Sequence, residues 1–198
     1  MITRLSNGIT LRLIELGTIE KSDQELYSYG VFMLTSQILY FTLSLLTGLI
    51  FNVFAESIVF FITFQSIRKI AGGYHASTEG RCTMMSILSI VVSIGLIGLL
   101  EKCDIDLVVS ISSTISAILI FVLAPLDTDE KSLSTKEYRR FKKKTRVILL
   151  IIVIIIVLSL CIRFDMLFLP CCVSLILEGI LLLAGKIKKV KMVKHADH

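Results

Sequence analysis

Residues 26–67 read LYSYGVFMLTSQILYFTLSLLTGLIFNVFAESIVFFITFQSI, and Glu56 is the only charged side chain among them. A helix needs about 20 apolar residues to cross the hydrocarbon core of a bilayer. The stretch is therefore long enough for two spans, divided by a turn between Asn52 and Glu56. This pattern predicts a fold of membrane-embedded helices.

Four further uncharged runs follow along the chain. They cover residues 83–100, 107–126, 147–162 and 166–177, the last continuing past Glu178 to Gly185. The run at 147–162 is short, but Arg146 and Arg163 could extend their charged ends to opposite interfaces. We expect about six membrane-embedded helices, and the pattern leaves open whether the second one crosses the membrane or re-enters.

The composition agrees with a membrane protein. The chain has 198 residues, of which 55% are hydrophobic, and its mean hydropathy is +0.84. Globular domains are usually about 45–50% apolar. The charged surface is too small to cover a soluble helical core. We predict an all-α polytopic integral membrane protein with one membrane domain over residues 1–198. It would comprise an amphipathic interfacial segment (1–25), membrane helices (26–185) and a basic cytosolic tail (186–198).

The positions of Lys and Arg predict the orientation of these helices. The segment before the first run, the segments after the second and fourth runs, and the tail carry 19 Lys and Arg, whereas the three alternate loops carry two. Positive loops stay in the cytosol. We therefore expect a multi-pass protein of the cell membrane, with both termini, the 68–82 region and the 126–146 loop on the cytosolic side.

The N-terminal segment is amphipathic. Its apolar residues fall on one helical face at Ile2, Leu5, Ile9, Leu13 and Leu16. Such a helix is typical of one lying in the membrane interface. An ordinary cytosolic helix packed on the first span explains the same pattern.

One short segment, RKIAGGYHASTEGRC at residues 68–82, carries the candidate chemistry. His75 is the only histidine before the last four residues, and Cys82 is the only cysteine predicted on the cytosolic side. A thiol with a nearby imidazole is the arrangement of a cysteine nucleophile and its general base. Arg81 and the expected helix start at Cys82 both favour a thiolate.

The spacing of the two residues requires a bend in the chain. In one unbroken helix, the two residues would be about 10 Å apart along the axis, which is too far for a hydrogen bond. Gly72, Gly73 and Gly80 supply backbone freedom for a bend that brings His75 to Cys82. A polar cytosolic loop with an incidental histidine is the alternative interpretation.

Other polar residues have weaker assignments. Gln65 could orient a substrate or His75. Glu178 lies inside the last span, where it could pair with a polar group of another helix or of a second subunit, or be uncharged. The other cysteines are more typical of small apolar fillers, and one His with one Cys provides too few ligands for a zinc site. We therefore expect no metal or cofactor.

The loop before the fifth run is strongly basic. Its cluster consists of Arg139, Arg140, Lys142, Lys143 and Lys144. These side chains could attract an acidic substrate segment, or they could bind anionic lipid head groups and fix the topology. Nucleic-acid binding is not expected, because no recognisable binding fold accompanies the charge.

Residues 68–82, in a basic polytopic chain of this length, resemble the accessory gene regulator protein B (AgrB) family. The shared features are Arg68, the Gly72-Gly73-Tyr74-His75-Ala76 run and the Arg81-Cys82 pair. Outside this motif, the resemblance covers most of the chain in layout rather than in residues.

The resemblance implies a membrane cysteine endopeptidase of Gram-positive quorum sensing. It would remove the acidic C-terminal tail of a small AgrD-like precursor peptide and promote cyclisation to a thiolactone or lactone. By the same resemblance, Cys82 would be the nucleophile, His75 the base, and Arg68 and Gly73 supporting residues, in a homodimer.

Two other functions remain open from the sequence. A peptide exporter or transporter could use the same spans, although no G-x-x-x-x-G-K-[ST] phosphate-binding motif is present. A membrane scaffold without proteolytic activity is the third. Loss of peptide processing in Cys82→Ala would separate the enzyme from both.

Overall fold

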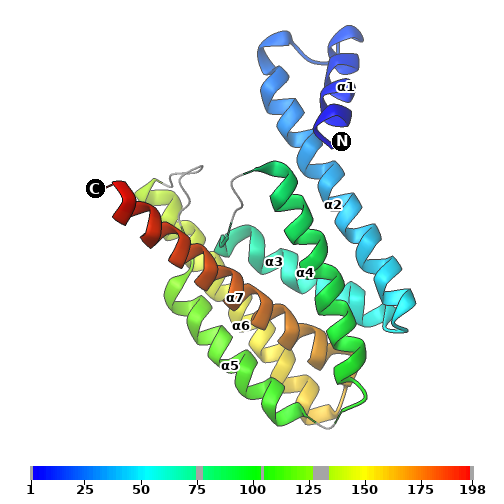
Figure 1. Cartoon of the computed structure of the whole chain (residues 1–198), viewed down its shortest axis with the longest axis vertical. Helices are drawn as coiled ribbons and strands as arrows, with labels where there is room; N and C mark the ends of the chain where they lie inside the picture. Colours follow the sequence, from blue (N-terminus) through cyan, green and yellow to red (C-terminus); the bar gives the residue numbers. More distant parts are fainter. Residues whose placement is uncertain (1, 75–77, 104, 127–133, 197–198) are drawn as a thin grey trace. The chain divides into compact units, whose positions relative to one another are not determined.

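The computed structural model describes residues 2–74, 78–103, 105–126 and 134–196, and every regular element in these ranges is helical (Figure 1). The elements are α1 (Ile2–Glu15), the short 3-10 helix η1 (Lys21–Asp23), α2 (Gln24–Ile50), α3 (Phe54–Ala71), α4 (Glu79–Leu100), α5 (Asp106–Leu123), α6 (Thr135–Ile162) and α7 (Asp165–Ala196). The predicted all-α fold is confirmed.

Five helices in the described ranges are long and apolar enough to cross a membrane, namely α2, α4, α5, α6 and α7. The exception among the long helices is α3, which has 18 residues and carries Glu56, Arg68 and Lys69. The turn before α3 lies at residues 51–53, where Asn52 has a φ of 61°. The predicted turn is present but shorter, because Glu56 already lies in α3, and crossing or re-entry of α3 stays a prediction.

The chain forms two compact units, Met1–Leu43 and Ser44–His198. This division leaves the single membrane domain a prediction. In the first unit, the Ser28 hydroxyl donates to Asn7 Oδ1, which ties α2 to α1. The apolar side chains of Leu5 and Ile9 on α1 are exposed. Their exposure fits the interfacial interpretation of α1 better than packing of that face on α2.

In the second unit, α7 is the central helix. It packs against α3, α4, α5 and α6, and it is the most buried of the five helices named above. The core is formed by large side chains of α3 and α7 that have almost no exposed surface: Phe60, Ile67, Phe168, Leu175 and Leu182. The end of α2 joins this unit through Ser44, whose hydroxyl donates to the Ser57 carbonyl at 3.0 Å.

The prediction of a loop up to residue 146 is wrong, because α6 begins at Thr135. Ser134 and Glu137 form a capping box: the Ser134 side chain accepts from the Glu137 N–H, and the Glu137 carboxylate accepts from the Ser134 N–H. This arrangement satisfies N–H groups that would otherwise be free at the helix start. The basic cluster at 139–144 therefore lies on a rigid helix.

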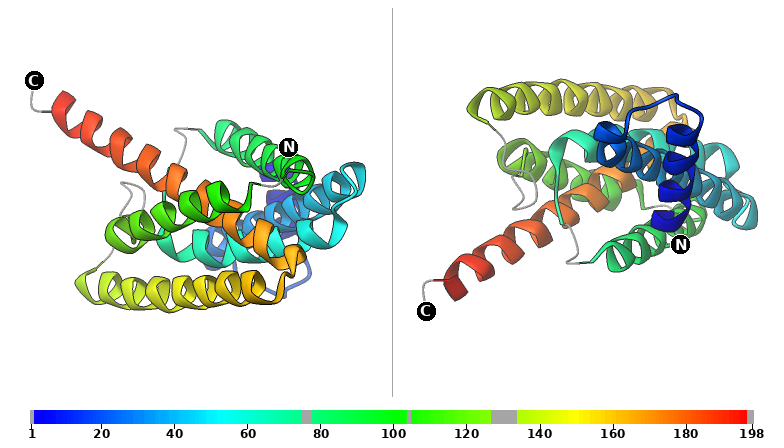
Figure 2. Two further views of the ribbon diagram at one scale, coloured as in Figure 1. Left: turned by 90° about the horizontal axis from the view of Figure 1, so that it is seen from below. Right: turned by 90° about the horizontal axis from the view of Figure 1, so that it is seen from above.

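The predicted boundary at residue 186 is not a structural break. α7 continues through the basic residues to Ala196, and Figure 2 shows its C-terminal turns extending past the other helices of the second unit. No proline or glycine follows Gly185. Because nothing in the sequence interrupts the helix, the last membrane helix and the basic tail form one element.

Candidate active site

The site begins where α3 ends. Gly72 caps the helix with a φ of 78°, its N–H donating to the Arg68 carbonyl, and Gly73 follows with a φ of 131°. These backbone angles strongly favour glycine. A Cβ at Gly72 would lie 2.7 Å from the Leu126 carbonyl oxygen, and one at Gly73 would overlap the Arg68 guanidinium. The Gly-Gly pair therefore turns the chain at the end of α3 and allows close contacts, whereas the bend between His75 and Cys82 stays a prediction.

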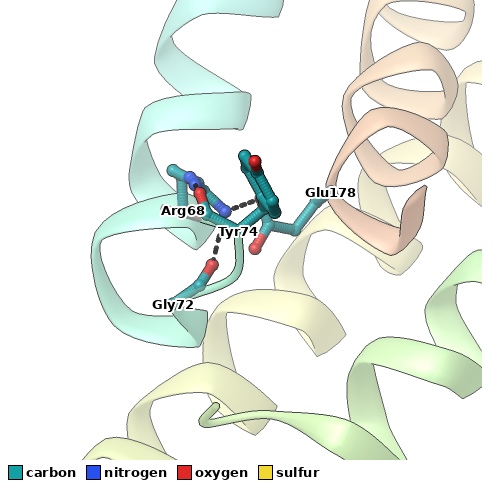
Figure 3. Close-up of polar contacts among 4 residues, drawn as sticks. All are labelled: Arg68, Gly72, Tyr74 and Glu178. Atoms are coloured by element: carbon teal, nitrogen blue, oxygen red, sulfur yellow. Dashed lines mark hydrogen bonds and ion pairs between the residues drawn. The ribbon is translucent and has the colours of Figure 1, made fainter. Parts of the chain in front are cut away.

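Arg68 holds the chain after this bend. Its Nη1 donates to the Gly72 carbonyl at 2.7 Å and its Nη2 donates to the Tyr74 carbonyl at 2.7 Å (Figure 3). The fork of a guanidinium suits two acceptors at once, and a charged donor strengthens each bond. The 72–74 segment is thus fixed to the last turn of α3.

The same segment also lies against α7 and against Leu126, which follows α5. The Tyr74 N–H donates to the Leu181 carbonyl at 3.0 Å, and the Leu126 N–H donates to the Ala71 carbonyl at 2.8 Å. A Cβ at Gly185 would lie 2.8 Å from Gly73 C and 2.9 Å from Tyr74 N. Only a glycine at position 185 leaves room for this approach of the segment to α7.

The candidate nucleophile, Cys82, lies in the first turn of α4. The helix is capped by Thr78, whose carbonyl accepts the Cys82 N–H at 3.0 Å and whose side chain accepts the Arg81 N–H. Cys82 is half-buried and its thiol is free. A helix start was predicted at Cys82, and α4 begins three residues earlier, at Glu79. Gly80 is helical, so it takes no part in the bend.

The other four cysteines are free as well. Cys103 and Cys161 are exposed, whereas Cys171 and Cys172 are buried in α7. No disulfide links any of the five. This distribution fits the prediction that the buried cysteines serve as small apolar fillers.

His75 lies outside the described residues, so its distance to Cys82 stays a prediction. Gln65 is half-buried on α3, one turn before Arg68, and its orienting role also stays a prediction. Within the described ranges, no three His, Cys, Asp or Glu side chains are grouped as metal ligands. The structure brings Arg68 and Gly73 together and places Cys82 on the next helix.

The basic cluster of α6 lies on two faces of the helix. Arg139, Lys142 and Lys143 line a shallow depression together with Arg146, Val147 and Leu150. Arg140 and Lys144 are exposed outside it. The lining of the depression is basic at one end and apolar at the other.

Two contacts of the site were not predicted from the sequence. Glu178 of α7 lies with Oε2 3.8 Å from Arg68 Nη1, and its side chain has no exposed surface. Gly185 provides the close approach described above. The signal for Glu178 was present as a carboxylate in an apolar run, but nothing in the sequence named its partner. In the sequence, Gly185 is only the last residue of an uncharged run.

These features define a helical multi-pass membrane protein with a free thiol at a helix N-terminus and a clamped glycine turn before the histidine. The family model described as accessory gene regulator B matches residues 3–182. The chain belongs to this AgrB family, which gives it an AgrB-like role in the processing of quorum-sensing peptides.

Two relatives from Clostridium perfringens support this membership. The chain is 30% identical to AgrB-like protein 2 of strain 13 over 172 residues, covering 83% of this chain and 80% of the relative. It is 28% identical to an AgrB-like protein of strain SM101 over 173 residues, covering 84% and 80%. No solved structure matches the chain.

Proposed function

We propose that the protein is a membrane cysteine endopeptidase that removes the C-terminal tail of a small AgrD-like precursor peptide and promotes its cyclisation to a thiolactone or lactone. Cys82 is the nucleophile and His75 the general base. The observation that carries the proposal is the half-buried free thiol of Cys82 in the first turn of α4. Family membership supports the substrate class.

The first step forms an acyl-enzyme. His75 takes the proton of the Cys82 thiol, and the thiolate attacks the carbonyl that joins the precursor to its tail. The carbon–nitrogen bond breaks, the imidazolium gives its proton to the leaving amine, and a thioester to Cys82 remains.

The second step closes the ring. A thiol or hydroxyl of the precursor gives its proton to His75 and attacks the thioester carbonyl. The bond to the Cys82 sulfur breaks, and the thiolate takes the proton back. Exchange of one thioester for another changes the free energy little, whereas hydrolysis would destroy the intermediate. Water therefore has to be kept away from the acyl-enzyme. The Cys82 thiol is partly buried, which limits the access of water and supports this part of the proposal.

The orientation and partners belong to the same proposal. Both termini and the 68–82 region face the cytosol of a Gram-positive cell, as the positive-inside rule indicates. The basic depression of α6 attracts the acidic tail of the precursor, and its cations also contact anionic lipid head groups. The active form is a homodimer, as in the family that the motif resembles.

The experiment is co-expression of the precursor with wild type, Cys82→Ala and His75→Ala, followed by gel separation of full-length and cleaved peptide. Cys103→Ala and Cys161→Ala are matched controls, because both remove an exposed free thiol elsewhere. We expect cleavage to be lost in Cys82→Ala, to fall by about 10²–10⁴-fold in His75→Ala, and to persist in both controls. Cleavage by folded Cys82→Ala would exclude the cysteine mechanism and favour an exporter or scaffold.

A further inference from the structure

Glu178 is an unusual residue of the central helix. Its side chain has no exposed surface, and neither carboxylate oxygen has a hydrogen-bond partner in the part of the chain that the structure describes. A buried carboxylate is costly unless a charge or donor compensates for it. Packing alone would be served better by an apolar side chain at this position.

The compensating charge is Arg68. The distance from Glu178 Oε2 to Arg68 Nη1 is 3.8 Å, and the Arg68 side chain is 19% exposed. Figure 3 shows Glu178 reaching from α7 toward the guanidinium, which also binds the carbonyls of Gly72 and Tyr74. Around this partly buried pair, the effective dielectric constant is lower than in water, so the attraction between opposite charges is stronger. The carboxylate therefore favours the one guanidinium position from which both carbonyls are reached.

Tyr74 is the residue directly before His75 in the chain. We propose that Glu178 is a positioning residue for the peptide-processing site: it holds Arg68 against the carbonyls of Gly72 and Tyr74 and so sets where the chain leaves toward His75. The inference rests on the proposed function of His75. Glu178 acts through Arg68 and has no surface with which to touch the precursor.

A second contact also binds the segment before His75 to α7. The Tyr74 N–H donates to the Leu181 carbonyl, one turn after Glu178. The segment before His75 is thus bound to the same helix by one hydrogen bond and, through Arg68, by one ion pair. Loss of the carboxylate should loosen the segment without changing the surface that binds the precursor.

The test compares wild type, Glu178→Gln and Ser174→Ala in detergent or nanodiscs. Ser174 is the matched control, because it is also buried on α7, one turn before Glu178, but its hydroxyl donates to the Phe60 and Pro170 carbonyls. In Glu178→Gln we expect the processing rate at saturating precursor to fall by about 10–100-fold, with KM within about twofold of wild type. Ser174→Ala should keep the wild-type rate.

Amide hydrogen exchange measures how firmly the 72–74 segment is held, independently of precursor processing. In Glu178→Gln the Tyr74 amide should exchange faster, whereas the Ile90 and Ile94 amides in the middle of α4 should exchange as in wild type. Unchanged exchange at Tyr74, or a wild-type processing rate, overturns the proposal. If Cys82→Ala still processes the precursor, the proposed function fails, and exchange at Tyr74 still decides the positioning role.

A double variant covers the case in which Glu178→Gln does not fold. Removal of both charges in Arg68→Gln/Glu178→Gln leaves no buried charge without its partner, although the Gly72 and Tyr74 carbonyls lose the guanidinium donor. If Glu178 acts through Arg68, the double variant should process the precursor at the rate of Arg68→Gln alone. An additional loss that multiplies the effect of Arg68→Gln would contradict the positioning role.

Discussion

Arg68 at the end of α3 and the cations at the beginning of α6 are both basic groups of the second unit, but their surroundings differ. Arg68 donates two hydrogen bonds to backbone carbonyls and pairs with a buried carboxylate. Arg139, Lys142 and Lys143 line an open depression on one helix face. A cation with fixed partners can determine backbone geometry, whereas cations at an open surface act by attraction over a distance.

From this comparison, we expect substitution of Arg68 to reduce precursor processing more than any other change considered below. Arg68→Gln removes the charge that pairs with Glu178 and the fork that holds two carbonyls. We expect processing to fall by at least about 100-fold, because displacement of a catalytic group by about 1 Å has an effect of this size. The matched control is Lys69→Gln, at the exposed neighbouring position. Equal losses in the two variants, measured by precursor cleavage, would contradict the clamp.

The next effect comes from the turn that Arg68 holds. In Gly73→Ala the new Cβ meets the Arg68 guanidinium at a φ of 131°, so either the turn or Arg68 has to move. We expect about a tenfold to 100-fold lower rate of cleavage. In Gly80→Ala, where the Cβ meets nothing within 4 Å, helix propensity should stabilise α4 by about 0.5–1 kcal/mol. The rate of cleavage and the thermal unfolding temperature are measured for both variants. A wild-type rate of cleavage in Gly73→Ala would contradict the account.

A smaller effect is expected on the α7 side of the segment. Gly185→Ala places a Cβ 2.8 Å from Gly73 C, whereas Gly179→Ala places one 3.0 Å from the Ser116 side chain. Both changes disturb packing of α7, but only the first one pushes on the 72–74 segment. We expect Gly185→Ala to reduce cleavage by about tenfold and Gly179→Ala to reduce it by about twofold or less. The reverse order would show that general packing of α7 is what matters.

The smallest effect belongs to the open basic surface. The triple change Arg139→Gln/Lys142→Gln/Lys143→Gln should raise KM for an acidic precursor about two- to fivefold, and less at high salt, because exposed charges contribute little and are screened. Arg140→Gln/Lys144→Gln, on the face outside the depression, is the control. Equal changes in KM for both variants would favour general lipid contact over binding of the precursor.

Much of this fold follows from the sequence, since long uncharged runs leave few alternatives to membrane helices. The turn at Asn52 and a helix near Cys82 were both predicted, although α3 and α4 begin at Phe54 and Glu79, a few residues before the predicted positions. Local signals explain these successes, because turns and helix starts depend on neighbouring residues. The helical start of α6 was missed, although Ser134 and Glu137 have the capping-box spacing.

The site was harder to predict for a physical reason. Arg68 and Glu178 are far apart in the chain, and a single sequence does not reveal which buried charges meet. Gly185 is similar, because its importance depends on the backbone of Gly73 that approaches it. The residue types of the site follow from the motif, whereas its contacts depend on how α3 and α7 pack.

The most direct test of the account is mass spectrometry of the Cys82 peptide from protein co-expressed with a precursor whose ring-closing thiol or hydroxyl is replaced by Ala. Because that precursor cannot close the ring, the acyl-enzyme should accumulate. The account predicts the tailless precursor attached to Cys82 in the wild type and no adduct in His75→Ala. Release of the tail by the wild type without any adduct on Cys82 would contradict it.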